Sequence, residues 1–208
     1  MQSYKSVTRL ASCEIKVKNS RFIATIAPVL CENDANEFLS QMRRNYRDAS
    51  HNVFAYRVLH GGLLERQSDD GEPSGTAGKP ILDIISGAGL LNVCINVARY
   101  FGGVLLGTGG LVRAYQAASR ETISTAQICQ FRRLVPSRLV IPYHCYDKFL
   151  HISRNHGYTI QDSAFAEDVT LDIICEEAAA TGLQNHISAL SLNARLSFGE
   201  AYFGVITQ

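Results

Sequence analysis

The sequence lacks a long apolar run. No segment approaches the roughly 20 consecutive apolar residues that a helix needs to cross a bilayer. Residues 1–10 mix Lys5 and Arg9 with polar residues and lack the apolar core of a secretory signal. We therefore expect a cytoplasmic protein with no membrane partner, whose 46% hydrophobic residues supply a substantial core.

The sequence also lacks a C-x-x-C pair. This absence excludes a thioredoxin-like motif and a paired zinc site. The six cysteines are scattered along the chain and are expected to be reduced thiols that mostly serve packing: Cys13, Cys31, Cys94, Cys129, Cys145 and Cys175.

Neither common nucleotide-binding motif is complete. Gly78-Lys79 has the dipeptide of a phosphate-binding P-loop, but Pro73 stands where the first glycine belongs and Pro80 provides no hydroxyl for Mg²⁺. A dinucleotide fingerprint starting at Gly107 fails at Val112, where its third glycine would be. No Ser-His-Asp or Cys-His nucleophile can be nominated from spacing, so a non-enzymatic role is favoured, with enzymatic activity left open.

Charge is distributed unevenly. Residues 1–133 carry 16 Lys and Arg against 11 Asp and Glu, a net charge of +5, whereas residues 134–208 carry 4 against 8, a net charge of −4. The basic part favours an anionic partner, although an ordinary surface can also carry such an excess. The acidic part favours a protein partner.

Hydrophobic periodicity predicts mixed strands and helices in the first part of the chain. Alternation predicts a hairpin of two strands that turns at Asn19-Ser20. Apolar residues at helical spacing predict two amphipathic helices, the first starting at Asp34 and the second capped by Thr108. The predicted strands are 14–18, 21–27, 53–59 and 92–99, and the first helix is 34–46.

The pattern restarts near residue 133, which predicts two domains, 1–133 and 134–208. The second follows a βαββαβ order, the ferredoxin-like arrangement, within an α+β protein. Its predicted elements are strand 134–141, helix 144–155, strands 158–165 and 169–175, helix 176–190 and strand 194–202.

Two glycine-rich blocks, 68–80 and 98–115, hold eight of the 16 glycines. Glycine permits left-handed backbone and close approach, so the blocks predict loops of demanding shape that form the working surface. The free amides of the helix start after Gly107 can hold a phosphate, with cationic and aromatic neighbours adding contacts and base stacking. The alternative is that the glycines serve packing alone. The predicted anion or nucleic-acid contacts are Lys79, Arg99, Tyr100, Gly102, Gly103, Gly107, Thr108, Gly109, Gly110 and Arg113.

Three carboxylates lie close together in the first block. Asp69, Asp70 and Glu72 offer hard oxygen ligands that suit Mg²⁺, although D-G is also a common turn dipeptide. His144, Asp147 and His151 share one predicted helical face, and a solvated face is the favoured interpretation. No cofactor is expected apart from a possible Mg²⁺ at the first cluster.

The two glycine-rich blocks, read as S-D-D-G-E-P-S-G-T-A-G-K-P and A-R-Y-F-G-G-V-L-L-G-T-G-G-L-V-R-A-Y, resemble the signature blocks of the IMPACT family. Asp48-Ala49-Ser50-His51 and Lys18-Asn19-Ser20-Arg21-Phe22 fit the same family, and the whole length is similar to its bacterial YigZ members. The resemblance implies an N-terminal α/β two-layer domain with the fold of a ribosomal protein, and a C-terminal ferredoxin-like domain. It also implies a link to translational regulation, which is the role of eukaryotic relatives.

These observations predict an RNA-binding or ribosome-associated protein, with RNA or the ribosome as partner and a possible protein partner for the acidic domain. Two alternatives remain open. One is an Mg²⁺-dependent enzyme acting on a small phosphorylated substrate. The other is a protein-interaction scaffold.

Overall fold

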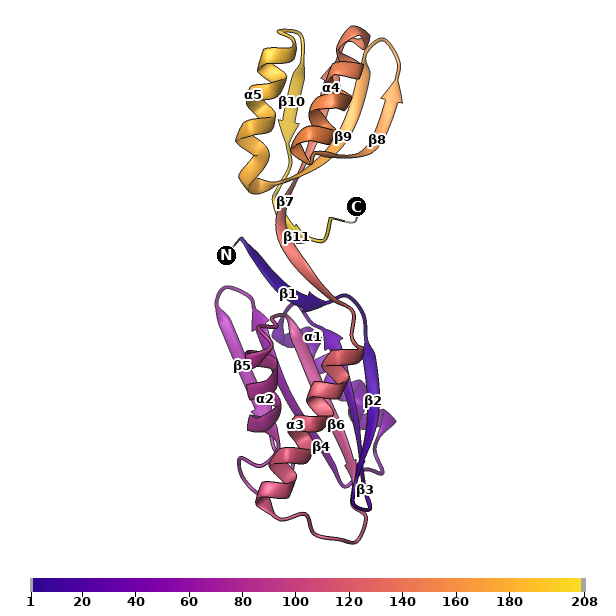
Figure 1. The fold of residues 1–208 in the computed structure, drawn as a ribbon, viewed down its shortest axis with the longest axis vertical. Coiled ribbons are helices and arrows are strands. Elements are labelled where there is room, and N and C mark those ends of the chain that lie inside the picture. The colour runs from indigo at the N-terminus through magenta and orange to yellow at the C-terminus, as the bar shows by residue number, and fades with distance from the viewer. Residues whose placement is uncertain (1, 207–208) are drawn as a thin grey trace. The chain divides into compact units, whose positions relative to one another are not determined.

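A computed structural model of the chain describes residues 2–206. Its residues separate into two compact units, one of Tyr4–Gln130 and one of Phe131–Gln208 together with Met1–Ser3 (Figure 1). The division falls three residues before the boundary expected after residue 133.

The first unit is built on a five-stranded antiparallel sheet with the order β2-β3-β6-β4-β5. β-branched and aromatic residues dominate its central strands, as the sequence predicts. The strands are β2 (Ala11–Val17), β3 (Ser20–Pro28), β4 (His51–Leu59), β5 (Leu63–Ser68) and β6 (Val93–Tyr100). The short β1 (Ser3–Val7), which the sequence analysis missed, forms a parallel bridge from Lys5 to Leu90.

Helices cover both faces of this sheet (Figure 1). α1 (Glu32–Asn45) packs its buried Phe38, Leu39 and Met42 against one face. α2 (Gly78–Gly87) and α3 (Thr108–Thr125) pack against the other, where their apolar residues join those of the strands in the larger core. The unit therefore has three layers rather than the two expected. None of the helices within residues 2–206 is long and apolar enough to cross a bilayer.

The start of α1 lies two residues before the predicted one. Cys31 is the N-cap, and no side chain caps the helix there. Asp34 instead accepts a hydrogen bond from the backbone N–H of Leu30 at 2.8 Å, so its carboxylate is bound back to the chain before the helix. That bond, more than any other interaction, lowers the pKa of Asp34.

Strand register brings the glycine-rich segments to one end of the first unit. His51 at the start of β4 pairs with Arg99 near the end of β6, and Phe54 pairs with Ser68, the last residue of β5. α2 follows β5 and α3 follows β6, so both helices begin at this end and run in the same direction. We call this end, formed by residues 69–77, 101–107 and the two helix starts, the loop end.

The second unit has the βαββαβ order predicted from the sequence, and four strands of its six-stranded sheet follow the ferredoxin-like order β10-β7-β9-β8 with antiparallel neighbours. β11 pairs with an earlier part of β7, also antiparallel. Both helices lie on one face, where Phe149, Leu183 and Ile187 pack against alternate residues of the central strands. The elements are β7 (Ile128–Ile141), α4 (Tyr143–His156), β8 (Thr159–Phe165), β9 (Val169–Glu176), α5 (Ala180–Leu190), β10 (Arg195–Phe198) and β11 (Tyr202–Gly204). The α+β class is confirmed.

Candidate anion-binding site at the loop end

Glu72 is the centre of a buried polar cluster at the loop end. Arg99 Nη1 donates to Glu72 Oε1 at 2.7 Å, and the Tyr115 hydroxyl donates to the same oxygen at 2.7 Å. The three residues retain only 7%, 4% and 0% of their exposure, respectively. Burial, and then the hydrogen bond to the carboxylate, raise the pKa of Tyr115 well above its usual value. Glu72 therefore links loop 69–77 to both β6 and α3.

Arg99 is not the open phosphate contact that the sequence predicts. Its position on β6 follows Ile95 and Val97 on the face covered by α2 and α3, which is why it is buried. Its guanidinium lies 5.5 Å from the ring centroids of both Phe22 and Phe101. With Glu72 as its counter-ion, Arg99 has a structural role.

Asp69 caps α2. Its Oδ1 accepts hydrogen bonds from the backbone N–H groups of Ala77 and Gly78 at 3.0 and 2.8 Å, and Oδ2 accepts from Gly75 at 2.8 Å. A carboxylate at a helix N-terminus satisfies free amides and complements the helix dipole. Asp69 therefore folds loop 69–77 onto the helix start.

The three carboxylates predicted as Mg²⁺ ligands do not converge. Asp70 Oδ2 accepts from the Asn52 backbone N–H at 2.6 Å, while the Asp70 carbonyl contacts His51 Nδ1 at 2.8 Å. Asp69 is engaged with amides and Glu72 with Arg99 and Tyr115. Within residues 2–206 there is no group of three or more His, Cys, Asp or Glu side chains placed to hold a metal ion. These acidic residues shape the loop.

The start of α3, in contrast, is open. Gly107 is the N-cap, with φ at 71°, so Thr108 is the first helical residue rather than the predicted cap. In the described chain, no side chain caps this helix start and its first turn contains no acidic residue. Thr108 and Gly109 are exposed and Gly110 is half-buried. Their amides are positively polarised and available to an anion.

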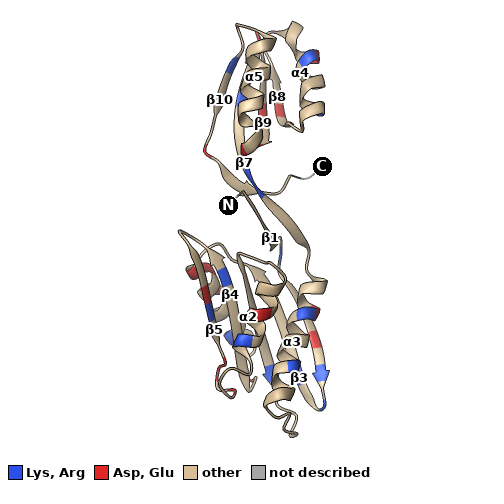
Figure 2. Ribbon diagram, turned by 60° about the vertical axis from the view of Figure 1, so that its left-hand side comes forward, with Lys and Arg blue, Asp and Glu red and all other residues tan. Residues whose placement is uncertain are grey.

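The two remaining predicted cations lie near the loop end but differ in availability. Lys79, in the first turn of α2, forms an ion pair with Asp83 one turn later. Arg113, in the second turn of α3, is exposed and has no ion-pair or hydrogen-bond partner in the described part of the chain. Figure 2 shows other Lys and Arg residues on the strands and helices of this unit. Arg113 is the more available of the two.

Phe101 is the more exposed aromatic side chain here, although Tyr100 was expected to be the stacking residue and the Arg99 guanidinium lies near the Phe101 ring. The Tyr100 hydroxyl donates to Asp48 at 2.9 Å, and the Arg21 guanidinium lies 4.6 Å from the centroid of its ring. Phe101 is 47% exposed, at the start of loop 101–107. The stacking candidate is thus one residue further along the chain than predicted.

Two predicted glycines have a structural requirement rather than a binding one. A Cβ on Gly102 would lie 2.0 Å from the backbone carbonyl carbon and oxygen of Asn19, so only glycine fits. Gly103 has φ at +78°, in the left-handed region that favours glycine. Gly102 lets loop 101–107 pack against Asn19 in the β2–β3 turn, and Gly103 lets the loop change direction next to it.

The buried cluster was not predicted from the sequence, although two features of the sequence indicate it. Continuing the alternation of Val93, Ile95 and Val97 puts Arg99 on the buried face of β6, where a charge needs a partner. Tyr115 follows Leu111 at helical spacing on the buried face of α3, so its hydroxyl also needs a partner. Glu72, in the neighbouring block, is that partner.

The glycine-rich segments that build this site lie within a recognised domain. The family model of the Impact N-terminal domain matches residues 18–123, and a domain of unknown function, DUF1949, matches residues 139–191. The chain belongs to the IMPACT family. The resemblance found in its two signature blocks is confirmed.

Relatives in this family align over most of the chain. IMPACT family member YvyE of Bacillus subtilis is 29% identical over 92% of this chain and 88% of its own length. A family member of Thermus thermophilus is 42% identical over 68% of this chain and 72% of its own length. The crystal structure of a hypothetical protein matches 94% of this chain and 97% of its own, at a TM-score of 0.64 and 28% identity.

Proposed function

We propose that this IMPACT family protein binds RNA through the loop end of its first unit, as part of a ribosome-associated role in regulating translation. The observation that carries the proposal is the start of α3, where Thr108 and Gly109 are exposed residues without a side-chain cap and Arg113 has no partner among residues 2–206. A phosphate fits this combination because helix amides and a guanidinium both donate to anionic oxygens.

Neighbouring residues extend the contact surface. Lys79 lies at the start of the parallel helix α2, where exchanging Asp83 for a phosphate would keep its ammonium paired. Phe101 provides a face on which a base can stack. Together they describe a small single-stranded RNA site with two or three phosphate contacts and one base contact, sequence-tolerant because stacking and phosphate contacts do not read base edges.

The proposed role in translation is based on sequence similarity to relatives. The chain is 36% identical, over 95 residues, to human Protein IMPACT, and the family resemblance implies translational regulation for eukaryotic members. The proposed partners imply that the protein acts in the cytoplasm. An Mg²⁺-dependent enzyme fits less well, because the three carboxylates it requires accept hydrogen bonds from β4, the start of α2 and β6.

Anisotropy of a fluorescent single-stranded RNA, titrated with the full chain over a series of salt concentrations, tests the proposal. Arg113→Ala and Lys79→Ala should each weaken binding and each lower the slope of log affinity against log salt by about 0.7, the value for one lost phosphate contact on a single strand. Arg120→Ala is the matched control, since Arg120 is exposed on α3 two turns further from the helix start.

Two outcomes would overturn the proposal. One is equal affinity of wild type and the Arg113→Ala/Lys79→Ala double variant at low salt. The other is an equal loss in Arg120→Ala, because that would indicate general attraction to a basic surface rather than a site at the loop end.

A further inference from the structure

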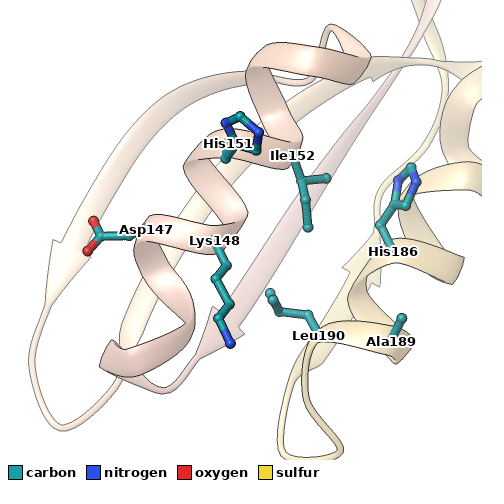
Figure 3. A pocket seen from close by; sticks show the side chains of 7 residues that line it. All are labelled: Asp147, Lys148, His151, Ile152, His186, Ala189 and Leu190. Atoms are coloured by element: carbon teal, nitrogen blue, oxygen red, sulfur yellow. The ribbon is translucent and has the colours of Figure 1, made fainter.

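The helical face of the second unit has a groove between α4 and α5. Its volume is about 580 Å³, and it is lined by Asp147, Lys148, His151, Ile152, His186, Ala189 and Leu190 (Figure 3). Ile152, His186 and Leu190 face the space between the helices, whereas Asp147 points away from α5. The volume is within the range of small-molecule sites, which lies at roughly 300 to 1,000 Å³.

Charged residues are distributed unevenly between the helices and the strands of this unit. Of the four Lys and Arg in residues 134–208, Arg138 pairs with Asp172 and Arg195 with Asp168. The other two, Lys148 and Arg154, both lie on α4 and have no partner in the part of the chain that the structure describes. Of the eight carboxylates, only Asp147 is on α4 and none is on α5. On these two helices Lys and Arg outnumber Asp and Glu by two to one, whereas residues 134–208 as a whole are acidic.

Histidines add donors to the same face. Four of the six in the chain are on these helices: His144, His151, His156 and His186. The His186 ring is held in place, because its Nδ1 lies 3.0 Å from the Tyr158 hydroxyl and its centroid 4.1 Å from that of His156. A fixed imidazole at the groove wall favours a ligand with a hydrogen-bonding group.

The size and charge of the groove point to one kind of occupant. Its lining spans only positions 147–152 of α4 and 186–190 of α5, which is too short for a partner helix anchored over two or more turns. Lys148 is the one Lys or Arg of the lining, and with the carboxylate of Asp147 beside it the lining matches a single negative charge better than a phosphate dianion. We propose that this groove binds a small apolar carboxylic acid, with its carboxylate at Lys148 and its hydrocarbon body against Ile152, Ala189 and Leu190.

The site is independent of RNA binding, since it lies in the other unit and shares no residue with the loop end. The probe pair 4-phenylbutyrate and 4-phenylbutanol tests it, because the two differ in charge and hardly in size. The full chain, isotope-labelled, is titrated with each probe while the backbone amide signals of both units are followed by NMR.

We expect 4-phenylbutyrate to shift amides of α4 and α5 alone and to bind about fivefold more tightly than the alcohol, the ratio that an exposed ion pair provides. Lys148→Met should reduce that ratio to about one. Arg154→Met, which removes the other unpaired cation of α4 but no lining residue, should leave it unchanged. Ala189→Phe, at an exposed position that fills the groove, should weaken both probes at least tenfold.

The proposal is overturned if 4-phenylbutyrate shifts no amide of α4 or α5, if Ala189→Phe binds it as well as wild type does, or if Lys148→Met and Arg154→Met lose affinity equally. The last result would indicate attraction to the helical face as a whole. The spectrum of each variant also reports whether the second unit is folded, so a failure to fold cannot be mistaken for lost binding.

Discussion

Arg99 Nη1 and Glu72 Oε1 lie 2.7 Å apart in the interior of the first unit, joining residues 27 positions apart in the sequence. Both side chains are almost fully removed from water. A buried pair of this kind positions the chain segments that carry it, and breaking it leaves an uncompensated charge. The pair fixes loop 69–77 to the end of β6.

Arg99→Met should destabilise the protein by about 3 to 5 kcal/mol, because the Glu72 carboxylate stays buried without its counter-ion. Urea-induced unfolding of the full chain measures this loss. The double variant Arg99→Met/Glu72→Gln should recover a large part of it, because it removes both charges while Gln can still accept from Tyr115. Equal stability of the single and double variants would argue against the pair as the source of the loss.

Asp69→Ala should destabilise the first unit by about 2 kcal/mol, since the backbone N–H groups of Ala77 and Gly78 at the start of α2, and that of Gly75 in the loop before it, lose their acceptor. Thermal unfolding followed by circular dichroism measures the change. Asp83→Ala is a suitable comparison, because Asp83 forms only an exposed pair with Lys79 and should cost less than about 1 kcal/mol.

Mg²⁺ should leave the thermal unfolding of the wild type unchanged, because Asp69, Asp70 and Glu72 are already engaged by hydrogen-bond donors of the chain. A ligand that binds the native state raises its unfolding temperature with concentration. A rise with Mg²⁺ that disappears in Asp69→Ala would restore the metal-site interpretation.

Gly102→Ala and Gly109→Ala should have effects of opposite sign. The first places a Cβ 2.0 Å from backbone atoms of Asn19 and should cost about 3 kcal/mol or more, because backbone must move. The second is helical, and its Cβ would meet only Arg113 Nη1 at an ordinary 3.5 Å, so it should stabilise α3 by up to about 1 kcal/mol. Denaturation curves of the two variants and of wild type, recorded under the same conditions, measure both changes in stability. A Gly102→Ala variant as stable as wild type would contradict the close contact with Asn19.

Alkaline pH should weaken the fold through Tyr56. Burial, and then its hydrogen bond to Glu32, raise the pKa of Tyr56 from 10.0 to about 12. Because the pKa is higher in the folded state than in the unfolded one, the stabilisation is fully present below pH 10 and is lost between pH 10 and about 12. Tyr56→Phe should reduce the loss of unfolding free energy across this window. If Tyr56→Phe lost as much unfolding free energy across this window as wild type does, other titrating groups would be responsible for the loss.

The helices and strands that could be predicted are those whose sequence pattern lies within the element itself. α3 and α4 have regular apolar spacing, and the restart after residue 133 predicted the ferredoxin-like order that the second unit shows. α2 was missed because it begins within a glycine-rich block at Gly78-Lys79-Pro80. Proline is compatible with a first helical turn, and the cap that defines this start, Asp69, lies nine residues upstream.

The sequence predicted which segments form the loop end, but not the roles of all the residues in it. The exposed start of α3 and the exposure of Arg113 follow from local pattern. The burial of Arg99 and the engagement of Glu72 depend on pairings across 27 and 43 residues, which spacing alone does not specify. Tyr100 is the last residue of β6 and Phe101 follows it, and the contacts that distinguish them, from Tyr100 to Asp48 and Arg21 and from Phe101 to Arg99, are with residues on other strands or distant in the sequence or buried beneath the loop.

The parallel course of α2 and α3 has an electrostatic consequence. Two helix dipoles that point the same way set like partial charges next to each other, a cost that any nearby negative group reduces. α2 is supplied with such a group by its own chain, through Asp69. Among residues 2–206 no side chain does the same for α3, so the electrostatic cost of setting the two helix starts side by side is reduced at α2 alone.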